Sequence, residues 1–247
     1  MVTAAAQDQW RLLDVQAHDI RLTQIAHKQR SLPELAKIAE LEKKLADVDD
    51  VLIKARTVAT DAARDLTKAE GDVEQVRQRV ARNQARLDSG QGNSKDLQAI
   101  QHELESLAHR QGVLEDAELE VMERQETAEA AVRGATEKRE QVVAEIAVAA
   151  AARDKALEAL TDESDAEARD RENAAAGIPK DLLALYERIR ATSHGVGAAK
   201  LYQRRCEGCR MTLPPNDLAR IRNAPQNEVV RCEECSRILV RTAESGL

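Results

Sequence analysis

The sequence predicts a mainly α-helical protein, in which a long antiparallel coiled-coil hairpin is followed by a small, β-rich C-terminal module. Three observations lead to this fold class. Apolar residues recur at alternating steps of three and four from Ile38 to Leu87, a spacing typical of helices that pack against other helices. Only three of the 247 residues are aromatic and a third are charged, which favours long helices over a large globular core. Four cysteines gather near the C-terminus in two Cys-x-x-Cys pairs.

The first predicted element is a separate helix over residues 6–30, whose apolar side consists of Trp10, Leu13, Ala17 and Ile20. We expect this helix to pack beside the base of the hairpin. The next four residues, Ser31-Leu-Pro-Glu34, have the pattern of a capping box with proline in the first turn. A second helix is therefore expected to begin here.

The second predicted helix carries the most regular apolar repeat. Fourteen of its fifteen seam positions are apolar, and at 1.5 Å per residue the run spans about 75 Å. The exception is Asn83, for which two interpretations remain open: a buried polar residue that fixes the register, or a residue at a frayed, solvated end. The fourteen are Ile38, Leu41, Leu45, Val48, Leu52, Ala55, Ala59, Ala62, Leu66, Ala69, Val73, Val76, Val80 and Leu87.

The stretch Asp88-Ser-Gly-Gln-Gly-Asn-Ser94 interrupts the repeat, because two glycines cannot continue a helix cheaply. Asn93 or Ser94 is expected to cap a third helix, with Asp96 in its first turn. Since a short loop makes neighbouring helices antiparallel, residues 1–176 are predicted to form a helical coiled-coil hairpin with its tip at about 88–94. Residues 161–176 are polar, and the sequence is compatible with either a frayed helix or a linker there.

The third helix has a looser apolar seam, whose residues repeat at steps of seven: Ile100, Leu107, Leu114, Val121, Ala128, Ala135, Val142, Ala149 and Ala156.

Residues 177–197 are predicted to form a short helix and a linker. Gly177-Ile-Pro179 breaks the preceding helix. Residues 181–190 then place Leu182, Leu185, Tyr186 and Ile189 on one face of an amphipathic helix. The glycine-containing stretch 194–197 ends it.

The cysteines have the spacing of a site with four thiolate ligands: Cys206, Cys209, Cys232 and Cys235. Zn²⁺ accepts four thiolates in a tetrahedron, and such a site is closed to water and substrate, so one Zn²⁺ would have a structural role. Three other roles for the cysteines fit the sequence less well. A redox-active pair needs a βαβ context, and disulfides need an oxidising compartment. The cysteines of iron–sulfur clusters usually have more compact spacing. Residues 198–247 are therefore predicted to form a C4 zinc ribbon, whose folding depends on the metal because few of its residues are apolar.

Within the ribbon we expect strands over residues 198–205, 211–213, 229–231 and 238–240, and one short helix over 217–222. Residues 1–199 carry 28 basic and 38 acidic groups, whereas residues 200–247 carry 9 and 6. The ribbon's formal charge of +3 falls to about +1 once four thiolates hold a zinc ion.

The candidate contacts for nucleic acid or a partner protein are the ribbon residues Tyr202, Arg204, Arg205, Arg210, Arg231 and Arg237. Arginine can bind phosphates and tyrosine can stack on a base. The same side chains are also typical of a solvated ribbon surface, and Tyr202 can equally pack against the turn, or knuckle, that a Cys-x-x-Cys pair forms.

No motif typical of an enzyme stands out. His102 and His109 lie seven residues apart on one helical stripe, which follows from the heptad, and there is no His-Glu-x-x-His sequence or glycine-rich phosphate loop. No stretch approaches the apolar length of a membrane span, and the N-terminal residues show no apolar signal segment. We therefore expect a non-enzymatic protein of the reducing cytoplasm that does not bind membranes.

Three stretches carry a family resemblance: residues 93–104 around the tip, Ile178-Pro-Lys-Asp-Leu-Leu-Ala-Leu-Tyr-Glu-Arg-Ile189, and the ribbon from Cys206 to Leu239. The chain resembles the bacterial C4-type zinc-ribbon proteins with an N-terminal coiled-coil hairpin, a family that includes flagellar accessory proteins and a chlamydial sigma-factor-binding protein. The resemblance implies an α-hairpin, zinc on the four cysteines and an adaptor role. It also implies possible partners, because some members bind the alternative sigma factor of RNA polymerase and RNA binding has been linked to the ribbon. Ser236 stands where the family often has glycine, a position expected to have a left-handed backbone.

Two functional hypotheses follow. The first is a zinc-binding adaptor linked to transcription, with the hairpin as a protein-interaction arm and the ribbon as a contact for protein or nucleic acid. The alternative is a nucleic-acid-binding protein that acts through the ribbon, with the hairpin as a structural spacer. Both leave the partner and the oligomeric state open.

Overall fold

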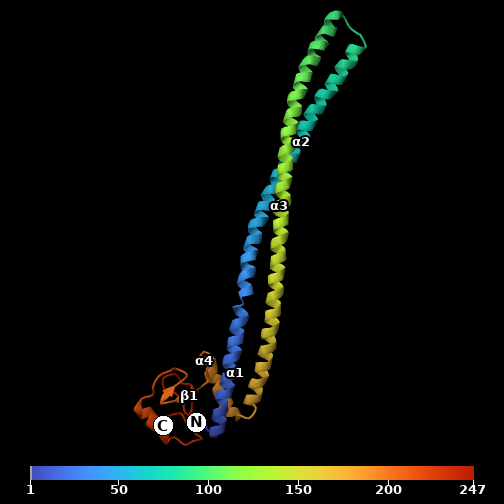
Figure 1. Cartoon of the computed structure of the whole chain (residues 1–247). Helices are drawn as coiled ribbons and strands as arrows, with labels where there is room; N and C mark the ends of the chain where they lie inside the picture. Colours follow the sequence, from blue (N-terminus) through green and yellow to red (C-terminus); the bar gives the residue numbers. More distant parts are fainter. Residues whose placement is uncertain (1) are drawn as a thin grey trace. The chain divides into compact units, whose positions relative to one another are not determined.

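The computed structural model describes residues 2–247, which divide into two compact units. One unit combines the residues up to Leu35 with Ala151–Leu247, and the other is the single segment Ala36–Ala150. Figure 1 colours the chain from the blue N-terminus to the red C-terminus. The units differ from the predicted segments 1–176, 177–197 and 198–247, because the first helix and the end of the third share a unit with the ribbon.

Segment Ala36–Ala150 is an antiparallel pair of helices contributed by α2 (Pro33–Asp88) and α3 (Ser94–Ala175), which run side by side in Figure 1. Two ion pairs between the helices reflect their antiparallel direction: Arg139 Nε lies 2.7 Å from Asp49 Oδ1, and Arg77 Nη2 lies 2.7 Å from Glu115 Oε1. Both pairs are exposed, so each adds little stability. The predicted helical hairpin is confirmed.

The seam between these helices follows the predicted repeats. The buried seam residues of α2 and α3 include Ile38, Leu41, Leu52, Val73, Val76, Ile100, Leu107, Val121, Ala128, Ala135, Val142 and Ala149. Asn83 is buried among them at 7% exposure, and its Nδ2 has no hydrogen-bond partner within residues 2–247. The interpretation of Asn83 as a solvated end is therefore wrong, and its role in fixing the register at a cost in stability stays a prediction.

The tip has the predicted cap. Asn93 Oδ1 accepts a hydrogen bond of 2.9 Å from the backbone N–H of Asp96, and the Asp96 carboxylate accepts one of 3.5 Å from the N–H of Asn93. Gly90 and Gly92 make the turn with φ of 64° and 139°, values that favour glycine. Asn93, rather than Ser94, is thus the capping residue.

The capping box expected at residues 31–34 does not form. Ser31 Oγ donates to the carbonyl oxygen of His27 at 2.9 Å, and its backbone N–H also bonds to α1 (Ala6–Arg30). Ser31 therefore closes the first helix instead of opening the second, and α2 begins at Pro33 with the carbonyl of Leu32 accepting from Leu35 N–H.

Residues 161–176, for which frayed helix and linker were both open, are helical almost to their end, since α3 continues to Ala175. Its polar last turns lie beside α1, where Glu167 Oε1 is 2.6 Å from His18 Nδ1. Across residues 2–247, none of the helices, α3 included, is long and apolar enough to cross a membrane.

A single core joins the helices of the first unit to the ribbon. It contains residues of α1, α4 (Lys180–Thr192), β1 (Ala198–Tyr202) and β3 (Ile238–Val240). A boundary at residue 198 would cut through this core. Its members include Leu12, Val15, Ile178, Leu182, Tyr186, Ile189, Ala198, Ile238 and Val240.

The buried face of α1 is not the predicted one. Trp10 and Ile20 are 47% and 42% exposed and Ala17 is exposed as well, so the interpretation of these residues as the packed side is wrong for three of the four. Leu13 alone packs against the core. The packed side mixes apolar and polar residues: Gln9, Leu12, Val15, Gln16, Asp19 and Ile25. Apolar spacing could not indicate this face, because half of its members are polar.

The buried carboxylate of Asp19 is the centre of a polar network. It is 1% exposed, accepts a 2.6 Å hydrogen bond from the Tyr186 hydroxyl, and lies 2.8 Å from Arg171 Nε and 3.0 Å from Arg190 Nη2. Glu187 also pairs with both arginines. Burial, together with the neighbouring Asp19 carboxylate, raises the pKa of Tyr186, so its hydroxyl stays a donor. The network ties α1, α3 and α4 together.

Gln16 extends this network to the start of β1. Its Oε1 accepts hydrogen bonds from the N–H groups of Gly197 at 2.7 Å and Ala198 at 3.3 Å, and its Nε2 donates to the carbonyl of Gly195 at 3.1 Å. A Cβ on Gly197 would lie only 2.7 Å from the Tyr186 ring, so this close approach requires glycine.

The ribbon is a three-stranded sheet in the order β2-β1-β3, with β2 at Arg205–Cys206. β1 pairs antiparallel with β2 and parallel with β3. The expected strands at 211–213 and 229–231 are reduced to the single bridges Arg205–Thr212 and Arg231–Ile238, because the chain bends into a knuckle beside each. The short helix is α5 (Pro215–Asn223).

Asp19→Ala should lower the stability of the unit that contains the ribbon by about 2–4 kcal/mol, because Arg171 and Arg190 would keep half-buried charges with only Glu187 as counterion. Urea unfolding followed by the fluorescence of Trp10, the only tryptophan, measures this change. The exposed Asp162 provides a matched Asp162→Ala control. Equal midpoints for the two variants would contradict the prediction.

Candidate metal centre

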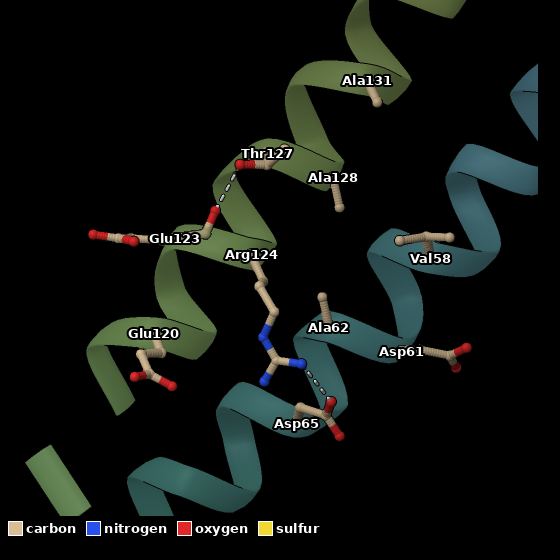
Figure 2. A pocket seen from close by; sticks show the side chains of 10 residues that line it. All are labelled: Val58, Asp61, Ala62, Asp65, Glu120, Glu123, Arg124, Thr127, Ala128 and Ala131. Atoms are coloured by element: carbon tan, nitrogen blue, oxygen red, sulfur yellow. Dashed lines mark hydrogen bonds and ion pairs between the residues drawn. The ribbon is translucent and has the colours of Figure 1, made fainter. Parts of the chain in front are cut away.

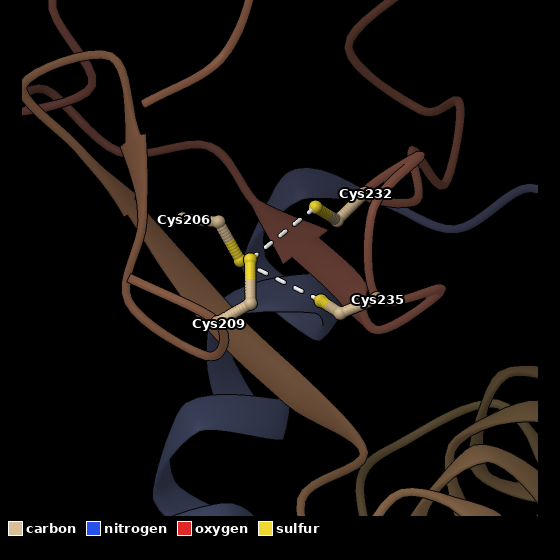
Figure 3. A group of neighbouring side chains, drawn as sticks. All are labelled: Cys206, Cys209, Cys232 and Cys235. Carbon is tan, nitrogen blue, oxygen red and sulfur yellow. Dashed lines mark hydrogen bonds between the residues drawn. The ribbon is translucent and has the colours of Figure 1, made fainter. Parts of the chain in front are cut away.

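Four sulfur atoms converge in the ribbon, as Figure 3 shows. The Sγ atoms of Cys206 and Cys235 are 3.9 Å apart, as are those of Cys209 and Cys232, and all four lie within 4.8 Å of one another. A tetrahedron with zinc–sulfur bonds of about 2.3 Å has sulfur–sulfur edges of about 3.8 Å. The four thiols therefore have the spacing required by one zinc ion.

Each Cys-x-x-Cys pair lies on a knuckle, and the two knuckles repeat one backbone pattern. The N–H of Arg210 donates to the carbonyl of Cys206 at 2.7 Å, and the N–H of Ser236 donates to that of Cys232 at 2.8 Å. Arg210 and Ser236 both have a left-handed backbone, with φ of 61° and 62°. The expected left-handed conformation at Ser236 is confirmed, and the first knuckle needs it as well.

An arginine before each knuckle reinforces this turn. Arg205 Nε donates to the carbonyl of Arg210 at 2.7 Å, and Arg231 Nε donates to that of Ser236 at 2.9 Å. Both guanidinium groups remain exposed beyond these bonds. Their side chains thus hold the knuckles closed while presenting positive charge beside the metal centre.

The protonation of the thiols depends on their burial. Burial raises the pKa of Cys206, and it raises the pKa of Cys232 to about 11, although backbone N–H groups act in the opposite direction. Burial also acts to raise the pKa of Cys235, but the N–H of Arg237 and the neighbouring thiols outweigh it and lower that pKa. Zinc binds thiolates, so the ion must displace protons from the buried pair.

The arrangement supports a structural role for the metal. The four sulfurs occupy all corners of a tetrahedron, so no coordination position is left for water or substrate. Both knuckles lie between β1 and β3 in the sequence, and one ion joins cysteines more than twenty residues apart.

Most of the predicted contact residues lie on the ribbon surface. Arg204, Arg205, Arg210 and Arg231 are exposed and form no ion pair with a residue in the described range 2–247, although Arg204 Nε donates to the carbonyl of Gly246 at 2.9 Å. Tyr202 is 37% exposed, and Lys200 Nζ lies 5.4 Å from the centroid of its ring, a cation–π contact. Their roles as contacts stay predictions.

Arg237 differs from the other predicted contacts. Its guanidinium donates to the carbonyls of Ser193 at 3.0 Å, Val196 at 3.2 Å and Gly208 at 3.0 Å. Most of its hydrogen-bonding capacity is therefore used within the protein, where it joins the first knuckle to the segment after α4. Its contact with a partner also stays a prediction.

Arg241 has a structural role that sequence reasoning missed. Its guanidinium donates to five backbone carbonyls that follow or end α5, those of Ile221, Ala224, Pro225, Gln226 and Glu228. Its own carbonyl accepts a 2.7 Å hydrogen bond from Trp10 Nε1. No local pattern indicates this role, because only the folded turn brings these carbonyls to one point.

The sequence matches the CT398-like coiled coil hairpin domain over residues 15–194 and the C4-type zinc ribbon domain over residues 205–239. The chain belongs to this hairpin family. The resemblance inferred from the sequence is confirmed, and the ribbon is a C4-type ribbon with one structural zinc site.

The relatives cover nearly the whole chain. Uncharacterized protein Rv2229c of Mycobacterium tuberculosis is 35% identical over 238 residues, which are 96% of this chain and 97% of that protein. A solved structure from Mycobacterium smegmatis has a TM-score of 0.86 at 34% identity and covers 97% of this chain and 100% of its own. CT398 from Chlamydia trachomatis has a TM-score of 0.67, covering 96% and 98% at 16% identity, a likeness that shows the fold alone.

Removal of zinc by a chelator should unfold the ribbon and loosen the core it shares with α1 and α4, while the helices of segment Ala36–Ala150 persist. Trp10 fluorescence should shift, because Trp10 bonds to the ribbon carbonyl of Arg241, whereas circular dichroism at 222 nm should change little. Zinc release to an indicator should be easier at pH of about 6 than of about 8, because protons compete for the thiolates. Unchanged fluorescence after complete chelation would contradict the prediction.

Ser236→Gly should stabilise the zinc-loaded protein by about 0.5–1 kcal/mol, because glycine adopts the left-handed backbone without the strain of a Cβ. Thermal unfolding followed by Trp10 fluorescence measures the shift. Ser193→Gly is the matched control, since Ser193 has a φ of −117° and gains no such relief. A gain in both variants, or in neither, would count against the argument.

Proposed function

We propose that this chain is a non-enzymatic, zinc-binding adaptor of the cytoplasm, in which the hairpin binds a partner protein and the ribbon makes a second contact, with a link to the transcription machinery. The observation that carries the proposal is the surface of segment Ala36–Ala150. Six of its large apolar side chains are more than half exposed: Val51, Ile53, Val58, Val113, Leu119 and Val148. Single exposed apolar residues are common, but here one of them also lines a groove.

The chemistry of the chain supports a binding role. Among the described residues, the cysteines are the only group of three or more potential ligands arranged to hold a metal, and their geometry leaves no open position. His102 and His109 lie on exposed turns of α3, and the only ion pair of His102 within residues 2–247 is with the exposed Glu105. These features favour recognition by surfaces over chemistry in a pocket.

Site-specific photo-crosslinking in full-length protein tests the adaptor function. A photoreactive residue at Val58 or Val148 samples the hairpin, and one at Arg210 or Arg231 samples the ribbon. We expect nuclease-resistant protein crosslinks from the hairpin positions, and they should persist in a Cys232→Ser/Cys235→Ser background. The absence of any protein above background at both hairpin positions would rule out the hairpin as an interaction arm.

Nucleic-acid binding by the ribbon is the second candidate. The observation that favours it is the group of exposed ribbon arginines without acidic partners among the described residues, namely Arg204, Arg205, Arg210 and Arg231. Tyr202 is exposed on the same ribbon. Such a surface would bind single-stranded RNA with an affinity that falls as salt rises. Fluorescence anisotropy with the wild type and Arg204→Gln/Arg210→Gln tests this, and an affinity that depends on neither salt nor these arginines would remove the candidate.

A further inference from the structure

We infer that a groove in the middle of the hairpin binds a basic amphipathic helix of a partner protein. This inference rests on the proposed adaptor function and deepens it, because it names both the surface and the chemistry of the partner. The groove is a hollow of about 710 Å³ between α2 and α3 (Figure 2). All of its lining residues belong to segment Ala36–Ala150.

The floor of the groove is apolar and poorly filled. Ala62, Ala128 and Ala131 line it beside Val58, which is 58% exposed. No residue of α2 between Leu52 and Val73 is fully buried, whereas the seam on either side of this stretch buries leucine, isoleucine and valine. Protein interiors are close-packed, so large apolar side chains from a third element would gain contacts here that alanine cannot supply.

The rim of the groove is acidic. Four carboxylates, those of Asp61, Asp65, Glu120 and Glu123, line it together with one guanidinium, that of Arg124. Asp61 also pairs with Arg64 at 3.4 Å, so these six groups carry a net charge of −2. Figure 2 shows Arg124 reaching across to Asp65, and their charged atoms are 3.9 Å apart.

Glu120 and Glu123 are exposed and form no ion pair with any residue of the described range 2–247. Complementary charge favours a partner with lysine or arginine at these positions. Nucleic acid would be repelled, because its phosphates carry the same sign as the rim.

The shape of the groove favours a helix. Residues 120–131 of α3 follow it for about 17 Å, or roughly three helical turns. The side-chain ridges of a third helix pack into the furrow between two others. The fitting occupant therefore has large apolar side chains at helical spacing, with basic residues beside this stripe that can meet Glu120 and Glu123.

Fluorescence anisotropy with the zinc-loaded full chain tests the inference directly. The probe is a labelled model helix with a leucine stripe flanked by lysines, compared with a scrambled peptide of the same composition and with a version in which glutamate replaces lysine. We expect saturable binding of the first peptide alone. Glu120→Lys/Glu123→Lys should weaken it about 10-fold or more, because two attractions become repulsions.

A matched control lies on the same helix. Glu137 and Glu140 have the same spacing and exposure, pair with no residue of the described range, and lie outside the groove. Glu137→Lys/Glu140→Lys should change the affinity less than about twofold, because exposed charges at a distance are screened by salt. Unchanged circular dichroism would show that both variants keep the hairpin.

Three outcomes would overturn the inference: no saturable binding to the wild type, equal binding of the scrambled peptide, or equal weakening by both double variants. A wild type that sediments as a dimer, and separates only in Glu120→Lys/Glu123→Lys, would instead assign the groove to a second copy. If protein crosslinks from Val148 persist while the peptide fails, the adaptor function stands and only the groove assignment falls. If Val58 and Val148 yield no crosslinks either, both fail.

Discussion

Convergence of four thiolates on one zinc ion is the constraint on which the C-terminal unit depends. The sheet of the ribbon is short, and its strands β1 and β3 supply Ala198, Ile238 and Val240 to the core that also holds residues of α1 and α4. Strands of this length cannot maintain such an arrangement without further links. The metal supplies the link, so the same ion that closes the ribbon also positions the apolar residues against which the helices pack.

A second set of interactions makes the ribbon and the helical base one unit. Gln16 and Asp19 place two buried polar groups on α1, and each is satisfied by partners from other elements. On the ribbon, Arg237 and Arg241 likewise link separate segments, because their guanidinium groups donate hydrogen bonds to backbone carbonyls. Buried polar groups are costly unless paired, so these contacts favour a single arrangement of α1, α4 and the sheet within this unit.

The hairpin follows a different principle. Its ends are packed by leucine, isoleucine and valine, whereas its middle relies on alanine and therefore buries less apolar surface. The alanine stretch lets the helices pair but leaves a hollow with an acidic rim. A segment that is weakly filled by its own chain and bordered by the unpaired carboxylates of Glu120 and Glu123 is suited to a partner that brings large apolar side chains and positive charge.

The sequence by itself determined the parts that follow from local spacing. Heptads predicted the hairpin seam, glycines and Asn93 predicted the tip, and two Cys-x-x-Cys pairs predicted the metal site, because each needs only neighbouring residues on one helix or turn. The packed face of α1, the role of Arg241 and the burial of Asn83 were decided only by the tertiary structure. The hydrogen-bond partners of the α1 face and of Arg241 come from segments far apart in the chain, so a buried glutamine or aspartate looks like a surface residue until folding brings those partners to it.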